Sequence, residues 1–262
     1  MTASTSRMVS SLILAGLTAI SVSSVASGDD WGTVKGRFVF GGNPPEASAL
    51  KADKDVEVCG KHKLVAEELV VGGDKGIANV VVFLRDKKVK VHPDLAGSGS
   101  TPVILDNKDC RFEPHVAFVQ VGQPLVIKNS DSIGHNSNVQ TLKNAASNNL
   151  IAAGGDSKIT FTADEAVPAQ VTCNIHPWMK AWVVIRDNPY CAVSKPDGSF
   201  EIANMPAGEG ELQFWHEKAG YISEAKVSGK SEKISKGRKK IVVKSGDNDL
   251  GEWVLDASAF SK

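Results

Sequence analysis

The chain has 262 residues, and its 30 Lys and Arg residues balance its 30 Asp and Glu residues. This balance gives no electrostatic reason to expect nucleic acid or an acidic substrate as a partner. The length allows one large domain or two modest ones.

The first 27 residues have the pattern of a secretory signal peptide. Arg7 supplies a positive charge, residues 8–25 are apolar and rich in small residues, and residues 24–27 suit cleavage. An uncleaved membrane anchor is the alternative, but the apolar stretch is short and weakly hydrophobic for a span. Residues 1–27 are therefore predicted to be a signal peptide. The mature protein is predicted to be periplasmic or secreted, without a membrane span.

Short strand patterns separated by turn residues recur along most of the chain. Residues 80–84 are a continuous apolar run, which indicates a buried strand. Further strand patterns occur at residues 115–121, 125–127, 158–162, 170–172 and 181–185. Such strands predict an all-β fold of β-sandwich type. Residues 136–156 are rich in Asn, Ala and Gly, and are predicted to form a long loop, with a short helix as the alternative.

The segment from Cys173 to Met179 carries the main chemical signal of the chain. It places a thiol, the imidazole of His176 and a thioether close together, and His135 upstream can supply a second imidazole. Two His, one Cys and a weak axial Met are the donors of a blue-copper site, whereas structural zinc prefers closed Cys and His tetrads. Cys and Met also fill cores, so each residue alone has an ordinary explanation. Their joint order favours copper.

With these four ligands in this order, residues 102–187 resemble a cupredoxin, a small single-copper electron-transfer module. The Cys-x-x-His-x-x-Met spacing, with Pro177 after the His, resembles the ligand loop of amicyanins. The resemblance implies a Greek-key β-sandwich that binds one type 1 copper through the four ligands. It also implies that Asn136, directly after the first His, ties the two ligand segments together by hydrogen bonds.

The same resemblance implies an electron carrier that cycles between Cu(I) and Cu(II). Its partner would be a redox protein, either a c-type cytochrome or a dehydrogenase. The His176 ring is expected at the surface as the exit for the electron, inside an apolar docking collar that includes Pro177 and Trp178. A closed site with four protein ligands leaves no position for a substrate, so an enzyme is not expected. The alternative is a copper-binding, adhesive or structural β-sandwich protein without an electron-transfer role.

The segments on either side of residues 102–187 have different sequence motifs. The Asp-Gly-Ser-Phe motif that begins at Asp197 and the Trp-His pair at Trp215 resemble carboxypeptidase-regulatory-like, transthyretin-type β-sandwiches. Residues 32–36 fit the Gly-x-Val-x-Gly strand with which such domains begin. Residues 31–100 and 188–262 are therefore predicted to form a second, smaller sandwich with the cupredoxin inserted. Three segments in series are the alternative.

The four cysteines divide unevenly. If Cys173 holds copper, three others remain, and export permits disulfides. Cys59 with Cys110 is the preferred pair, which leaves Cys191 as a thiol in an apolar setting. Sequence alone leaves the other pairings open.

Residues 221–244 are locally basic. A solvated, Lys-rich surface of edge strands is the favoured interpretation. A docking patch for an acidic redox partner is the alternative. No aromatic residues alternate with these charges, so a nucleic-acid platform is not expected.

Overall fold

The computed structural model describes Met1 and residues 30–261. The predicted signal peptide, apart from Met1, lies outside the described residues. The described chain is all-β, as the strand patterns predict, and its helical pieces are single turns. Within residues 30–261, no helix is long and apolar enough to cross a membrane.

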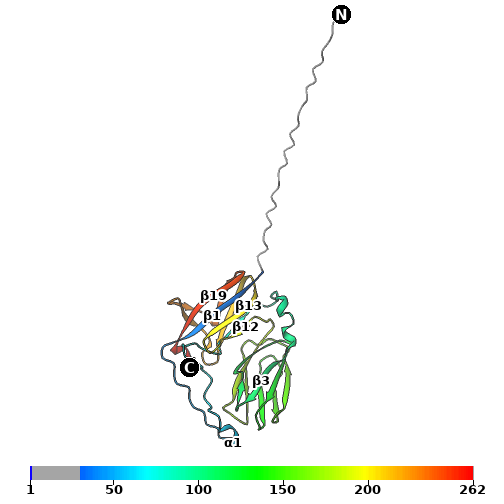
Figure 1. The fold of residues 1–262 in the computed structure, drawn as a ribbon, viewed down its shortest axis with the longest axis vertical. Helices are drawn as coiled ribbons and strands as arrows, with labels where there is room; N and C mark the ends of the chain where they lie inside the picture. The colour runs from blue at the N-terminus through cyan, green and yellow to red at the C-terminus, as the bar shows by residue number, and fades with distance from the viewer. Residues whose placement is uncertain (2–29, 262) are drawn as a thin grey trace.

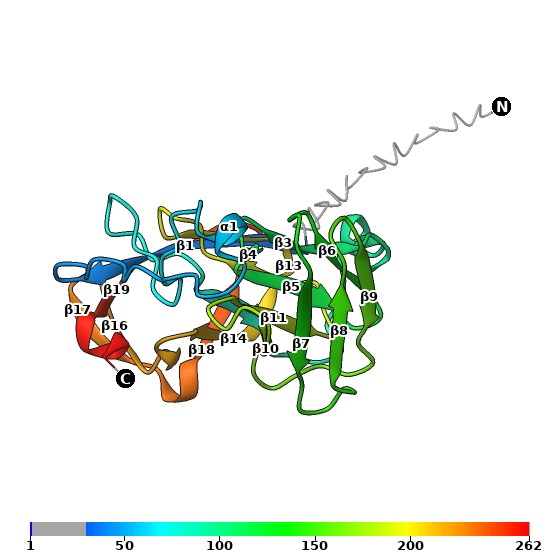
Figure 2. The same cartoon turned by 90° about the horizontal axis from the view of Figure 1, so that it is seen from below.

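The strands of residues 30–261 form four sheets, which make two lobes lying side by side (Figures 1 and 2). The terminal lobe takes its strands from residues before 85 and after 190, and the central lobe takes its strands from residues 103–186. The chain thus leaves the terminal lobe, builds the central lobe and returns.

The terminal lobe contains two sheets around an aromatic core. The first has the order β13 (Ser199–Pro206), β1 (Trp31–Gly41), β19 (Gly246–Asp256), β16 (Glu224–Val227) and β17 (Lys230–Lys233). The second has the order β12 (Cys191–Val193), β2 (Val81–Leu84), β14 (Gly208–His216) and β15 (Gly220–Tyr221), with β18 (Arg238–Val243) also paired to β14. Phe38, Phe214 and Trp253 are buried between the sheets, and their rings contact one another.

The central lobe also contains two sheets. One has the order β5 (Val116–Gln120), β11 (Lys180–Arg186), β10 (Ala169–Thr172), β7 (His135–Gln140) and β8 (Ser147–Ile151). The other has the order β4 (Arg111–Glu113), β3 (Val103–Lys108), β6 (Pro124–Asn129) and β9 (Asp156–Thr160). Figure 2 shows the green strands of this lobe beside the terminal lobe. Its core includes Leu105, Phe112 and Val183, and also Cys173 and Met179.

Strand β2 explains how the lobes join. Val82 and Leu84 face the terminal core, whereas Val81 and Phe83 face a second apolar layer. That layer also contains Val184 of β11 in the central lobe. A strand buried on both faces has a continuous apolar sequence, which accounts for the run at residues 80–84.

A long excursion connects β1 to β2 and carries the helical turn α1 (Val56–Cys59). A disulfide joins Cys59 to Cys110, with an S–S distance of 2.01 Å. In Figure 1 this turn lies at the lower end of the molecule, beneath the central lobe. The other short turns are η1 (Pro93–Leu95), η2 (Ser98–Ser100), η3 (Ser235–Gly237) and η4 (Ala257–Phe260).

The expectation of a long loop or short helix at residues 136–156 is wrong. Strands β7 and β8 pair there as an antiparallel hairpin, and β7 also pairs with β10. The Asn side chains support the pairing, because Asn136 Nδ2 donates to Asn148 Oδ1 at 2.7 Å. Asn is depleted in strands, so tertiary pairing overrides the local preference here.

Candidate metal centre

Three buried side chains converge at one end of the central lobe. His135 is the first residue of β7, and Cys173 and His176 lie in the turn between β10 and β11. Cys173 Sγ lies 3.9 Å from His135 Nδ1 and 3.6 Å from His176 Nδ1. The three donor atoms all lie within 4.8 Å of one another, and each residue is buried. Among residues 30–261, they form the group of His, Cys, Asp and Glu side chains that could hold a metal ion.

The ligand turn is closed by its own backbone. Met179 N donates to His176 O at 2.9 Å, and Cys173 N donates to Met179 O at 3.3 Å. Met179 is 1% exposed and belongs to the same core as Cys173. The predicted fourth ligand therefore lies in the same apolar core as Cys173.

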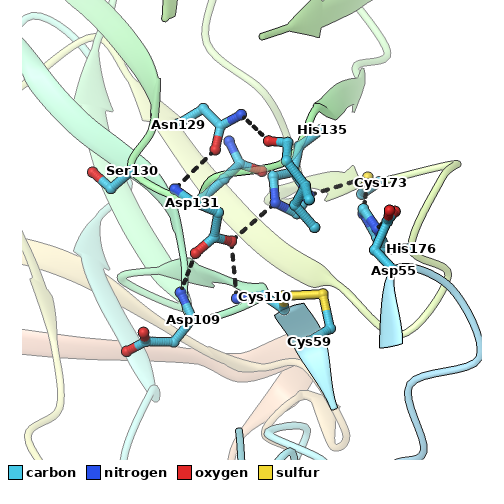
Figure 3. Close-up of polar contacts among 12 residues, drawn as sticks. Asp55, Cys59, Asp109, Cys110, Asn129, Ser130, Asp131, His135, Cys173 and His176 are labelled. Atoms are coloured by element: carbon cyan, nitrogen blue, oxygen red, sulfur yellow. Dashed lines mark hydrogen bonds and ion pairs between the residues drawn. A yellow bond between two sulfur atoms is a disulfide. The ribbon is translucent and has the colours of Figure 1, made fainter. Parts of the chain in front are cut away.

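A carboxylate orients each imidazole from outside (Figure 3). Asp131 Oδ2 lies 2.9 Å from His135 Nε2, and Asp55 Oδ2 lies 2.8 Å from His176 Nε2. An ionised carboxylate only accepts hydrogen bonds, so each Nε2 carries a proton. The Nδ1 atoms, which face Cys173, are then the donors available to a metal. This carboxylate–histidine arrangement is the usual support of a metal-binding imidazole.

Asp131 is itself fixed by the backbone near the disulfide. Its carboxylate accepts from Asp109 N at 2.8 Å and from Cys110 N at 3.0 Å. Burial would raise the pKa of Asp131, but these bonds and the one to His135 lower it. Burial would likewise lower the pKa of His135, but Asp131 and Cys173 raise it to about 9. Metal binding at Nδ1 would displace the second ring proton.

The surroundings of Cys173 favour its thiolate. Burial alone would raise the pKa of this thiol. Hydrogen bonds from His135, from the Asn136 and His176 backbone and from the His176 ring lower the pKa to about 6. A thiolate is the form of Cys that binds metals.

Asn136 connects the two ligand segments. Its Oδ1 accepts from Asn174 N at 2.7 Å and from Ile175 N at 3.2 Å. The same oxygen lies 3.5 Å from Cys173 Sγ. Its Nδ2 bonds to Asn148 on β8. This one side chain on β7 therefore links the ligand turn to both strands of the hairpin.

The expectation that the His176 ring lies at the surface is wrong. The ring is fully buried, because the excursion covers its Nε2 edge and places Asp55 there. Trp178 is half-buried rather than an open collar, and its Nε1 donates to Cys110 O at 3.0 Å. Its ring centroid lies 5.2 Å from that of His176. Pro177 is exposed beside it.

Trp178 and Pro177 line a hollow of about 210 Å³, here called the Trp178 hollow. The apolar part of its wall also includes Leu50 and Leu64 from the excursion. The polar part includes Glu67, Arg111, His115, Lys180 and Glu217. The Trp178 ring therefore contacts His176 and also lines this hollow.

Sequence reasoning did not identify the two orienting carboxylates. Asp131 precedes His135 by four residues, so a search for acids near the first His would have found it. Asp55 lies 121 residues from His176, and nothing local marks it. The remaining thiol, Cys191, is free and partly buried on β12. Burial raises the pKa of that thiol strongly.

The donor set fits copper. A thiolate and two inward-facing imidazoles lie at mutual distances that one ion can span, with a thioether in the adjoining layer. Soft sulfur donors combined with imidazoles suit copper, and a Cys/His₂ plane with a weak axial Met is the blue-copper arrangement.

No protein-family model matches the sequence, and a search of curated proteins found no match. Solved structures similar to part of the chain include a copper(I) amicyanin variant, at 19% identity over 40% of this chain and 97% of that one, with a TM-score of 0.30. A purple cupredoxin from Nitrosopumilus maritimus is 19% identical over 33% of this chain and 99% of that one, with a TM-score of 0.28.

A copper-containing nitrite reductase from Thermus scotoductus SA-01 is 23% identical over 32% of this chain, with a TM-score of 0.30. The chain spans only 22% of the length of that reductase. The assignment of the centre rests on its own donor atoms.

Proposed function

We propose that this protein is an exported type 1 copper protein that carries single electrons between redox partners. The observation that supports the proposal is the buried group of Cys173, His135 and His176, with both imidazoles turned inward by carboxylates. Copper, when bound, supplies a one-electron couple between Cu(II) and Cu(I). The chain supplies fixed donors, because each ligand is held by a hydrogen bond or by the core.

Each ligand has a separate role. Cys173 would hold copper through its strongly donating thiolate, and His135 and His176 would hold it through their Nδ1 nitrogens. Met179 would add a weakly bound thioether sulfur that tunes the reduction potential. Fixed ligands keep the geometry similar in both oxidation states, which is what a carrier needs.

We further propose that the electron crosses the surface at the Trp178 hollow. The excursion and Asp55 cover the His176 edge, whereas the Trp178 ring contacts His176 and borders the hollow. Exposed Pro177 lies on the same face. A c-type cytochrome or a dehydrogenase docking there would need only a small interface, below about 1,200 Å².

Export to the periplasm or the cell exterior rests on the predicted signal peptide at residues 1–27. The Cys59–Cys110 disulfide supports it, because disulfides persist in oxidising compartments. The transthyretin-type character of the terminal lobe, the domain boundaries and the stoichiometry of one copper per chain belong to the same proposal.

Copper titration of the purified mature protein tests the metal. We expect uptake of one copper and an intense visible charge-transfer band from the Cys173 thiolate. Cys173→Ser should abolish the band, whereas Cys191→Ser, a matched control at the other free thiol, should leave it unchanged. Preference for zinc, or copper binding without the band, would exclude a type 1 site.

Electron transfer is tested separately with a small c-type cytochrome. Pro177→Glu should slow exchange while the visible spectrum stays the same. Val242→Glu is the control, because Val242 is an exposed apolar residue of the terminal lobe. Equal rates for both variants would place the exchange face elsewhere. No exchange by the wild-type protein would favour a copper-binding role without electron transfer.

A further inference from the structure

A second, strongly basic hollow lies between the two lobes, away from the metal centre. It has a volume of about 480 Å³, and we call it the basic hollow. Its cationic lining consists of Arg85, Lys87, Lys143, Arg186, Lys236 and Arg238. Lys236 and Arg238 come from the basic stretch noted in the sequence, and Lys143 and Arg186 come from the central lobe. The fold therefore gathers charge from distant segments into one concave surface.

The lining cations of this hollow exceed its lining anions, although Glu211 outside the lining pairs with Arg85 at 2.5 Å. Asp164 is the one carboxylate in the lining as described. It lies 3.1 Å from Lys143 Nζ, 3.5 Å from Lys87 Nζ and 3.6 Å from Arg186 Nη1. Three cations thus share one acid. Among residues 30–261, neither Lys236 nor Arg238 forms an ion pair.

Arg186 gives the basic hollow a buried, incompletely bonded donor. Its side chain is only 6% exposed, its guanidinium lies 4.4 Å from the centre of the Phe83 ring, and Nη1 donates to Glu165 O at 3.1 Å. Its Nε is buried and has no hydrogen-bond partner. A buried donor without a partner is unfavourable, and Arg186 lies in the wall of this hollow.

Hydrogen bonds hold the walls of the basic hollow, one of them between the two lobes. The Tyr221 hydroxyl of the terminal lobe donates to Ala166 O of the central lobe at 2.5 Å. Gln213 Nε2 donates to Lys236 O at 2.8 Å, and Lys236 has a left-handed backbone with φ of 54°. A hollow with bonded walls is a preformed site rather than a loose surface patch.

We propose that the basic hollow binds a small multivalent oxyanion, bearing phosphate or carboxylate groups and bridging the two lobes. Arg guanidinium groups match both kinds of oxyanion in a planar, bidentate way, and Lys ammonium groups add point charge. The concave shape favours a small ligand over the broad surface of an acidic protein. A bound anion would hold the lobes together and raise the thermal stability.

Calorimetric titration with pyrophosphate and with citrate, at constant ionic strength, tests the proposal and distinguishes the two chemistries. We expect one binding site per chain and an increase in the unfolding temperature for at least one probe. Arg238→Gln and Lys143→Gln each remove a charge from a different lobe at an exposed position. Each should weaken binding by about tenfold, which corresponds to ~1.4 kcal/mol.

Lys230→Gln is the matched control, because Lys230 is an exposed cation of β17 outside the hollow. Equal weakening by this control would mean diffuse attraction rather than a site, and would overturn the proposal. Binding of neither probe would also overturn it. Much tighter binding of polyglutamate than of pyrophosphate or citrate would assign the surface to an acidic protein instead. None of these outcomes depends on copper.

Discussion

Asp55 offers the sharpest test of how the centre is built. It precedes the turn α1 in a left-handed conformation, with φ of 45° and ψ of 44°, and its side chain does not cap the helix. A left-handed non-Gly residue costs roughly 1–2 kcal/mol, and a side-chain N-cap is worth ~1 kcal/mol. Asp55 thus has the unfavourable backbone conformation and lacks the stabilising cap, and its carboxylate bonds to His176 Nε2 instead. Such local cost is typical of a residue held in place for function.

Asp55→Gly removes the carboxylate and at the same time relieves the backbone strain. The copper affinity should therefore fall while the free energy of unfolding of the metal-free protein changes little. Loss of a carboxylate behind a metal-binding His typically costs ~10–100-fold in affinity, which corresponds to ~1.4–2.7 kcal/mol. Asp55→Asn keeps an acceptor oxygen and tolerates the left-handed backbone, so its loss should be smaller.

Competition for Cu(I) against a chelator of known affinity measures this effect. Asp53→Gly is the control, since Asp53 is an exposed acid two residues earlier in the same excursion. The reasoning fails if Asp55→Gly and Asp53→Gly bind copper equally well. It also fails if Asp55→Gly unfolds the protein before any metal is added, because the residue would then be mainly structural.

Three further predictions concern the disulfide, the pH dependence and the Asn136 bridge. A Cys59→Ser, Cys110→Ser double variant should lower the free energy of unfolding by ~4 kcal/mol, because the disulfide closes a loop with a sequence separation of 51. Urea denaturation measures this change. A loss below ~1 kcal/mol would contradict the prediction. Burial lowers the pKa of His216 to about 4, below the ~6.5 of an unfolded chain, so the unfolded state binds the proton more readily. Stability should therefore fall as the pH drops from about 6.5 to 4, by up to ~3 kcal/mol at this site, and His216→Asn should flatten that part of the urea-derived pH profile; an equally steep profile in the variant would assign the effect to other groups. Asn136→Ala leaves two backbone amides of the ligand turn without their acceptor and should weaken copper binding by ~10-fold or more. Asn148→Ala, which removes only the side-chain bond between β7 and β8, should weaken it less. Equal losses would show that the bridge to the turn is unimportant.

The sequence predicts the local parts of this structure well. Cys173, His176 and Met179 lie within one turn, so their spacing alone brings them together. Strand β11 is an apolar, mostly buried segment that follows a turn, so its sequence pattern identifies it as a strand. The continuous apolar run at β2 likewise follows from burial on both faces.

The parts that sequence patterns miss depend on contacts between distant segments. The strands β7 and β8 contain many Asn residues, and their pairing is stabilised by neighbours rather than by intrinsic preference. Asp55 reaches His176 only because the excursion folds across the central lobe, and no local pattern encodes that path. The buried position of His176 follows from the same contact.

The two orienting carboxylates tie the metal centre to different parts of the chain. Asp131 belongs to the central lobe and is fixed beside Cys110, whereas Asp55 belongs to the excursion and lies four residues before Cys59. The disulfide therefore anchors both carboxylates through one covalent link. Because binding and conformational equilibria are coupled reciprocally, a metal that is held more tightly with Asp55 in place must also hold the excursion closed. Closure of the excursion and affinity for copper are then two measurements of one coupling free energy.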